Sequence, residues 1–173
     1  PDGAQWQISG EKIFISGGDQ DISDEILHLV LARTSDNGVK GLSLFLCPST
    51  KTDGTRNAVK VTRIEEKMGL HASPTCQMLF DGAQAELIGE EGRGLAAMFT
   101  MMNHARGDVA LQGVAHAARA HQIAATYAAD RVQGRLSDGS PARLDQHADV
   151  RRILDAMDRY ALFGRAMTHM AFV

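Results

Sequence analysis

The chain has 173 residues, of which 44% are hydrophobic and 23% are charged, and its formal net charge is −3. This composition is typical of a globular protein with one sizeable core, and the length suggests about one domain. Nothing in the charge balance indicates a nucleic-acid partner, and no apolar run approaches the ~18 residues of a membrane span. The first residues lack a signal-peptide pattern, and the isolated Cys47 and Cys76 are expected to be reduced and buried. We therefore expect a cytoplasmic protein.

The first half of the chain has the pattern of short β-strands. Apolar and polar residues alternate in "WQIS" and again in "KIFIS", and the Ser-Gly-Glu between them predicts a hairpin turn. Four further strands are predicted in "ILHLVLAR", "LSLFLCP", "NAVKVTRI" and "TCQMLFDG". Because no helix separates these strands, residues up to about Phe80 are expected to form an antiparallel barrel-like sheet.

The second half of the chain has helical periodicity. Apolar residues three and four apart predict a long helix from Leu95 to near Arg135, and a second helix from about Leu144 onward. Gly107 and Gly113 weaken the first helix, which is tolerable where another helix must approach closely. One apolar face is expected on the second helix, with Val150, Ile153, Met157, Tyr160, Gly164 and Met167.

These elements predict an α+β fold. An antiparallel β-barrel-like domain is expected over residues 1–88, followed over residues 89–173 by two long antiparallel helices of a truncated helical bundle. The chain opens at Pro1 without a methionine and stops within a helical pattern, so we expect a piece of a longer polypeptide. Two helices cannot cover all of their own apolar stripes, and we therefore expect self-association.

Three polar groupings allow more than one interpretation. The glycine-rich "GEEGRG" at Gly89–Gly94 opens a helix, where it could hold an anion or form a flexible turn whose acids complement the helix dipole. His116 and His121 lie five residues apart and do not share a helix face, so no metal site is expected. "ADRVQGR" ends the first helix with two arginines and a glutamine, which suit a phosphate or carboxylate but also complement the dipole.

Four motifs, taken in order, resemble the flavin-dependent acyl-CoA dehydrogenase family. "WQISGEKIFISGG" resembles the strand pair that faces the flavin, and "EKMGLHASPTCQMLFDGA" resembles a turn and the strand that follows it. "LIGEEGRGLAAM" resembles the turn into the family's long helix, and "YAADRVQGR" resembles the end of that helix. The resemblance covers the middle β-domain and the first two helices of the C-terminal helical domain. "GLHASPTC" and "HADVRR" are similar to a branch of the family with long polypeptides.

The resemblance implies an activity, a cofactor and partners. Members of the family desaturate the α,β-bond of an acyl-CoA thioester, in which a glutamate removes the α-proton and the β-hydrogen leaves as hydride to FAD. The electrons then pass to an electron-transfer flavoprotein. The chain is thus expected to be a fragment of such an enzyme, assembled as a homo-oligomer. The alternative is a non-enzymatic homologue or protein-interaction module that keeps the β-barrel.

The same motifs imply four cofactor-binding residues. Phe14 takes the place of a tryptophan beside the flavin, and Ser16 takes that of a hydroxyl residue near the flavin N5 edge. Arg131 and Gln133 align with residues that reach FAD on the neighbouring subunit.

Substrate-binding residues are implied on the long helix, but no catalytic one. Asn103 and Arg106 match positions that line the channel for CoA and the acyl chain. Ala105 stands where a minority of members place the catalytic glutamate, and the usual base would lie beyond Val173. The N-terminal helical domain of the family would precede Pro1. The chain alone is therefore expected neither to retain FAD nor to oxidise an acyl-CoA.

Overall fold

The computed structural model describes residues 6–172, which fall into two compact units. One unit extends to Thr100 and the other begins at Met101, and each is described separately. Among the described residues, no helix combines the length and the apolarity needed to cross a bilayer.

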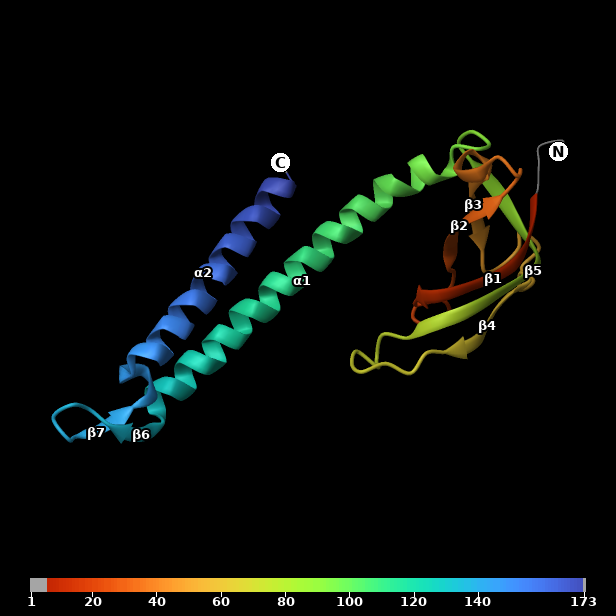
Figure 1. Cartoon of the computed structure of the whole chain (residues 1–173). Coiled ribbons are helices and arrows are strands. Elements are labelled where there is room, and N and C mark those ends of the chain that lie inside the picture. The colour runs from red at the N-terminus through yellow and green to blue at the C-terminus, as the bar shows by residue number, and fades with distance from the viewer. Residues whose placement is uncertain (1–5, 173) are drawn as a thin grey trace. The chain divides into compact units, whose positions relative to one another are not determined.

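The first unit is a curled antiparallel sheet with the strand order β1-β5-β3-β2, in which β4 also pairs with β5 (Figure 1). A short 3-10 helix, η1, spans Gly38–Gly41. The strands are β1 (Trp6–Ser16), β2 (Leu27–Arg33), β3 (Leu42–Pro48), β4 (Val59–Ile64) and β5 (Thr75–Ile88). The expected antiparallel barrel-like sheet is confirmed.

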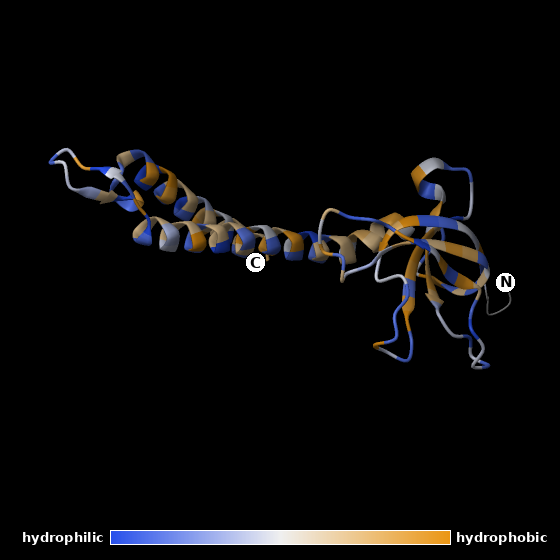
Figure 2. Cartoon of the chain, turned by 90° about the horizontal axis from the view of Figure 1, so that it is seen from below, coloured by the Kyte–Doolittle hydropathy of each residue, from blue (hydrophilic) through white to orange (hydrophobic). Residues whose placement is uncertain are grey.

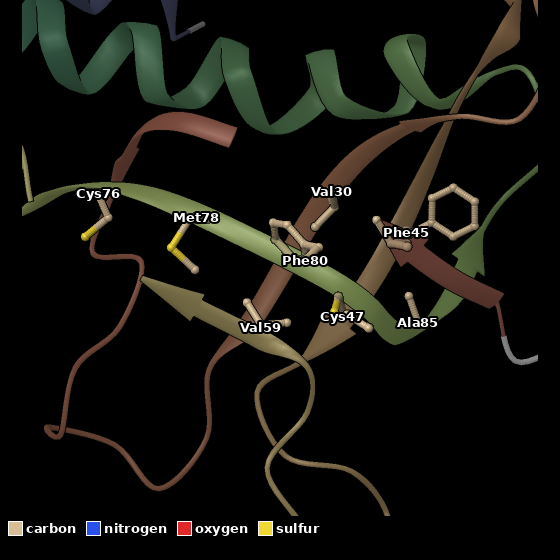
Figure 3. Close-up of a cluster of buried hydrophobic side chains, with 10 residues drawn as sticks. Val30, Phe45, Cys47, Val59, Cys76, Met78, Phe80 and Ala85 are labelled. Carbon is tan, nitrogen blue, oxygen red and sulfur yellow. The ribbon is translucent and has the colours of Figure 1, made fainter. Parts of the chain in front are cut away.

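Strand β5 holds the sheet together because it pairs with three neighbours. It contacts β1 along most of its length, β4 over Cys76–Phe80 and β3 over Glu86–Ile88. Its inward side chains form the middle of the core, against residues of β1 to β4 (Figure 3). The inward residues of β5 are Cys76, Met78, Phe80, Ala83 and Ala85. The alternation of inward and outward side chains along β5 shifts by one residue at Gly82, where φ is +70° and the pairing with β1 is irregular.

The predicted hairpin at Ser9, Gly10 and Glu11 is wrong. "WQIS" and "KIFIS" are one continuous strand, and Ser9 and Gly10 pair with Asp81 and Phe80 of β5. The Gly82 N–H donates to the Ser9 hydroxyl at 3.0 Å, so the Ser-Gly pair faces the irregular step in β5. A glycine inside a strand marks such a bulge as readily as it marks a turn.

The buried amide of Asn57 links three strands. Asn57 is 3% exposed, and its Nδ2 donates to the carbonyl oxygens of Pro48 and Gln84, each at 2.8 Å. Its Oδ1 accepts from the main-chain N–H groups of Gln84 and Ala58, each at 2.9 Å. Gln84 lies between the stretches of β5 that pair with β4 and with β3. The Asn57 side chain therefore takes the place of a missing strand neighbour there.

We expect Asn57→Ala to lower the free energy of unfolding by about 3 kcal/mol or more, because several buried main-chain groups would lose their partners at about 1–3 kcal/mol each. Urea denaturation measures the loss. Asn37→Ala is the matched control, since Asn37 is exposed and its side chain caps nothing. That change should cost less than about 0.5 kcal/mol. Equal losses in the two variants would contradict the role given to Asn57.

The second unit is a helical hairpin (Figure 1). Helix α1 (Gly94–Asp130) starts in the first unit, and α2 (Ala148–Ala171) runs back beside it. Between them lie β6 (Val132–Arg135), β7 (Pro141–Arg143) and the 3-10 helix η2 (Leu144–Gln146). The two antiparallel helices are confirmed, whereas the β6–β7 hairpin was not predicted and α1 ends before Arg135.

Three contacts fix the antiparallel register of α1 and α2. A Cβ on Gly107 would lie 2.1 Å from the Phe172 ring, and one on Gly164 would lie 2.9 Å from Cγ2 of Val114. Farther along, His121 Nδ1 lies 3.7 Å from an oxygen of Asp158. Each step forward along α1 is thus matched by a step back along α2. Gly107 does allow a close approach, as expected, but the same expectation for Gly113 is wrong, because a Cβ there would meet nothing within 4 Å.

The expected apolar face of α2 is wrong in half of its residues. The helix packs with a stripe at heptad spacing that is buried or half-buried: Val150, Leu154, Met157, Ala161, Gly164 and Thr168. By contrast, Ile153 is 45% exposed, Tyr160 75% and Met167 71%. These three belong to a second stripe, which we call the outer α2 stripe: Ile153, Ala156, Tyr160, Phe163, Met167 and Met170. Figure 2 shows apolar residues recurring along both helices.

Two glycine substitutions test the register of the hairpin. A Cβ on Gly113 would meet nothing within 4 Å, so Gly113→Ala should raise the free energy of unfolding by up to about 1 kcal/mol through helix propensity. Gly164→Ala brings the same gain in helix propensity, but its Cβ would clash with Val114. We therefore expect this variant to be stabilised less than Gly113→Ala, or to be destabilised. Thermal denaturation of the two variants gives the comparison, and an equal gain in both would show that Gly164 does not face α1.

Candidate cofactor-binding site

Phe14 lies in a bulge of β1 that turns its ring away from the core. Lys12 pairs with Met78 and Ile15 with Cys76, so the two residues between Lys12 and Ile15 both oppose a single residue of β5. Phe14 has φ 60° and is 68% exposed. A bulky residue in the left-handed region is uncommon and costs of order 1–3 kcal/mol, so the fold holds this aromatic ring outward against its backbone preference.

Ser16 is the last residue of β1. Ile15, which lies between Phe14 and Ser16, packs against the core. Ser16 pairs with Thr75 at the start of β5 and is exposed. The strand therefore presents an exposed aromatic residue and, two positions later, an exposed serine, and their assignment to cofactor binding stays a prediction.

Arg131 and Gln133 follow the end of α1 on a main chain that is firmly held. The Arg131 carbonyl accepts from the N–H of Leu144 at 2.9 Å, and the Gln133 carbonyl lies 2.8 Å from Nε2 of His147. Both residues are exposed, and their guanidinium and amide groups have no hydrogen-bond or ion-pair partner among the described residues.

Asn103 and Arg106 lie one turn apart on α1 and contact each other. Nη1 of Arg106 donates to Oδ1 of Asn103 at 3.2 Å, and both residues are exposed. Phe14 and Ser16 belong to the first unit, whereas Asn103 and Arg106 belong to the second. The structure therefore brings the six predicted site residues together as three neighbouring pairs, each within one unit.

The glycine-rich turn before α1 packs against β3. The Gly92 N–H donates to the hydroxyl of the fully buried Ser43 at 2.8 Å. A Cβ on Gly94 would lie 2.2 Å from the carbonyl carbon of Ser43, so only glycine fits there. Gly92 and Gly94 of "GEEGRG" therefore allow a close approach between main chains, which fixes the turn, whereas a Cβ on Gly89 would meet nothing within 4 Å.

Sequence reasoning missed a hollow beside this turn. It is lined by two cationic residues, Lys40 and Arg93, and by apolar residues of η1 and the first turns of α1. The remaining lining residues are Val39, Glu91, Gly92, Leu95, Ala96 and Phe99. The anion-site interpretation of "GEEGRG" pointed to this region, but Lys40 comes from a distant part of the sequence and gave no signal of its own.

Neither cysteine offers a nucleophile, and residues 6–172 contain no candidate metal centre. Cys47 and Cys76 are free and buried, as predicted, and burial raises the pKa of Cys47 to about 11. A thiol with that pKa stays protonated near neutral pH. Within the described residues, no group of three or more His, Cys, Asp or Glu side chains could hold a metal ion.

The chain is similar to known proteins of one family. Residues 1–83 match the family model described as "Acyl-CoA dehydrogenase, middle domain". The chain is 47% identical over 176 residues to the 3-methylmercaptopropionyl-CoA dehydrogenase of Ruegeria pomeroyi, an alignment that covers 96% of this chain and 30% of that protein. It is 39% identical to a broad-specificity linear acyl-CoA dehydrogenase of Mycobacterium tuberculosis, covering 94% of this chain and 30% of the relative.

The fold of a solved structure matches the chain over both units. The butyryl-CoA dehydrogenase of Megasphaera elsdenii matches 98% of this chain and 42% of its own chain, with a TM-score of 0.81 and 24% identity. This similarity shows the fold alone. The chain spans about 30% of the length of the curated relatives named above. Taken together, the family match, the sequence identities and the fold show that the chain belongs to the acyl-CoA dehydrogenase family, of which it comprises the middle β-domain and the start of the C-terminal helical domain.

Proposed function

We propose that the chain is part of an FAD-dependent acyl-CoA dehydrogenase, an oxidoreductase that introduces an α,β double bond into an acyl-CoA thioester. The observation that carries this proposal is the pair of Phe14 and Ser16. The pair lies in the stretch that matches the family model, and a strained bulge keeps the aromatic ring of Phe14 exposed two residues before the exposed Ser16. Strain retained at an exposed aromatic residue supports a role for that residue in binding.

The exposed side chains fit a flavin in part. Phe14 offers an aromatic wall for the ring system, and the Ser16 hydroxyl can hydrogen-bond to a ring nitrogen. Arg131 and Gln133 supply unpaired donors that suit the phosphates of FAD on a neighbouring subunit. FAD, when bound, supplies the acceptor for the β-hydrogen of the substrate. Phe14 has no indole N–H, so it can contribute stacking but no hydrogen bond.

The substrate side of the proposal rests on α1. Asn103 and Arg106 would line the channel for CoA and the acyl chain, where their amide and guanidinium groups lie on the exposed surface of the helix and hydrogen-bond to each other. The hollow lined by Lys40, Arg93 and apolar side chains borders the first turns of the same helix. Cations beside apolar surface suit a ligand that has both phosphates and an aliphatic chain.

The residues discussed so far supply neither the catalytic base nor the electron acceptor of the proposed reaction. No catalytic residue is assigned in this chain, since Ala105 has no proton-accepting group. We propose that the base belongs to a later part of a longer, cytoplasmic polypeptide, whose domains here are residues 1–88 and 89–173. Electron-transfer flavoprotein is the proposed electron acceptor, and the assembly is a homo-oligomer.

A non-enzymatic homologue that keeps the barrel for protein interaction is the second candidate. The broad exposed apolar surface of α2 favours it, because such surfaces mark protein contacts. The sequence that follows Val173 in the intact polypeptide separates the two candidates. A glutamate aligned with the family's base supports the enzyme, and its absence supports the interaction module.

The isolated chain should be colourless and inactive. We expect no stoichiometric FAD after gel filtration and no reduction of an artificial acceptor with any acyl-CoA. The strand with Phe14 and Ser16 and the segment with Arg131 and Gln133 supply only part of a flavin site. Each 1.4 kcal/mol of lost contact weakens binding tenfold. The intact polypeptide in the same assay is the positive control. Turnover by the isolated chain that disappears in Arg131→Ala would show that a complete site forms within it.

The strain at Phe14 can be measured as stability. Phe14→Gly should raise the free energy of unfolding by about 1 kcal/mol relative to Phe14→Ala, because glycine adopts φ 60° without a Cβ clash. Ile13→Gly is the control, since Ile13 is also exposed but is not in the left-handed region, and glycine there should destabilise relative to Ile13→Ala. Urea denaturation of the four variants decides the matter. A gain at Ile13 equal to that at Phe14 would contradict site-specific strain.

A further inference from the structure

Asn37 lies in the turn that joins β2 to η1, and a glycine follows it directly. The residue is exposed, and within residues 6–172 its side chain makes no hydrogen bond. Gly38 is exposed as well, with φ +51°, and a Cβ placed on it would meet nothing within 4 Å. The Asn37 carboxamide and the main chain that follows it are therefore both open to solvent.

Asn37 and Gly38 carry the two groups of an intramolecular reaction. The Gly38 nitrogen attacks Cγ of the Asn37 side chain, the new N–Cγ bond closes a five-membered succinimide ring, and the Cγ–Nδ2 bond breaks. The proton of the Gly38 N–H leaves with Nδ2 as ammonia. Water then opens the ring at either carbonyl group and leaves aspartate or isoaspartate at position 37. Glycine favours the attack because it has no Cβ beside the reacting nitrogen.

The fold holds the attacking nitrogen in a tight turn. Asn37 has φ −81° and ψ 50°, which is close to an inverse γ-turn, and the Gly38 N–H donates to the Asp36 carbonyl at 2.9 Å. Nη1 of Arg33 donates to the carbonyl oxygens of Ser35 at 3.3 Å and of Gly38 at 2.8 Å, on either side of Asn37. Because the turn must open locally before the nitrogen can attack, the Arg33 contacts should slow the reaction.

Two other turns contain an Asp–Gly step, but their carboxyl groups are engaged. Oδ1 of Asp53 accepts from the N–H and the hydroxyl of Thr55 at 2.8 and 2.6 Å. Oδ1 of Asp138 accepts from the N–H and the hydroxyl of Ser140 at 2.9 and 2.6 Å. These hydrogen bonds, those from the hydroxyl groups most of all, lower the pKa of both carboxyl groups. An ionised carboxylate is a poor target for a nucleophile, whereas the Asn37 carboxamide is neutral.

The surroundings protect the other asparagines of the chain. Asn57 is 3% exposed, and main-chain groups engage both ends of its amide. Asn103 lies inside α1, where the helix fixes its main chain, and its Oδ1 accepts from Arg106. A further Asp–Gly step, Asp81–Gly82, lies within β5, where Asp81 pairs with β1. Asn37 is therefore expected to react before these residues.

Either product would change the hollow beside the glycine-rich turn. Asn37 stands at the start of η1 and Lys40 in its last turn, and side chains three residues apart lie on the same side of a 3-10 helix. Lys40 is one of the two cationic residues that line the hollow. A carboxylate at position 37 would attract the Lys40 ammonium group, and isoaspartate would also lengthen the main chain at the start of η1 by one methylene group.

We propose that Asn37 is a spontaneous modification site, which deamidates through a succinimide with Gly38 to aspartate and isoaspartate, and that the Arg33 side chain slows this reaction. The isoaspartate product would be a substrate for a protein isoaspartyl methyltransferase. This inference goes beyond the proposed function and depends on neither FAD, acyl-CoA nor turnover.

Peptide mapping by mass spectrometry tests the site in the purified chain, incubated for days at neutral and at mildly alkaline pH. We expect the deamidated fraction to grow at least about tenfold faster at Asn37 than at Asn57 or Asn103. The rate should rise with pH, because the deprotonated nitrogen is the nucleophile. Methyl transfer by a protein isoaspartyl methyltransferase measures the isoaspartate. Equal rates at the three asparagines, or an Asn37 that stays intact, would overturn the proposal.

Gly38→Ala tests the ring closure, since the added Cβ hinders the attacking nitrogen but meets no other atom within 4 Å. We expect the rate at Asn37 to fall at least about tenfold. Gly54→Ala is the matched control, because Gly54 also has a positive φ and open space at its Cβ position. That change should leave the rate at Asn37 unaltered. A rate that Gly38→Ala does not lower would exclude the succinimide route.

Arg33→Ala tests the restraint on the turn. We expect the rate at Asn37 to rise at least about threefold, because local opening becomes easier. Arg63→Ala is the control, since Arg63 is also an exposed strand residue but pairs with Glu65 and not with this turn. If Arg33→Ala reacts no faster than Arg63→Ala, the role given to Arg33 is wrong. None of these measurements involves flavin or acyl-CoA, so failure here is distinguishable from failure of the enzymatic proposal.

Discussion

The curl of the sheet depends on one side-chain amide. Along the edge of β5 that lies away from β1, β4 is the neighbour near the start and β3 near the end, and between them this edge faces no strand. Asn57 fills that gap by hydrogen-bonding to both main-chain groups of Gln84. The sheet can therefore change neighbours without leaving buried polar groups unpaired. With β5 fixed in this way, its inward residues form the core, and the bulge of β1 carries Phe14 on the opposite side.

Alternation predicts the strands but not their continuity. "WQIS" and "KIFIS" were separated because a Ser-Gly pair between alternating runs satisfies both a hairpin and a bulge. The deciding partner is Gly82, which is far away in the sequence and faces Ser9 only in the folded sheet. The β6–β7 hairpin was missed because its strands, four and three residues long, are too short for periodicity to show.

For the candidate site and the helix faces, too, the sequence predicts one part and the structure is needed for the other. Local physics alone gave no reason to select Phe14 or Ser16, and the family resemblance selected them. The structure adds that a bulge, which no alternation rule anticipates, exposes Phe14. On α2, two heptad stripes lie side by side and form one broad apolar surface in the sequence. The burial of Ala161 and Thr168 and the close approach of Gly164 to Val114 show which stripe packs within the chain.

The anchored glycine turn determines where the gene can tolerate length changes. Gly92 and Gly94 fix the start of α1 against β3, and the same helix continues without interruption from the first unit into the second. A helix advances 100° per residue, so inserting or deleting a single codon between Gly94 and Phe99 would rotate Phe99, which lines the hollow beside the turn, by that angle relative to the anchor. Surface loops accommodate an added or missing residue by bending, but in a continuous helix every residue that follows the change is rotated. Length variation among homologues should therefore be absent from this segment, even where the side chains vary freely.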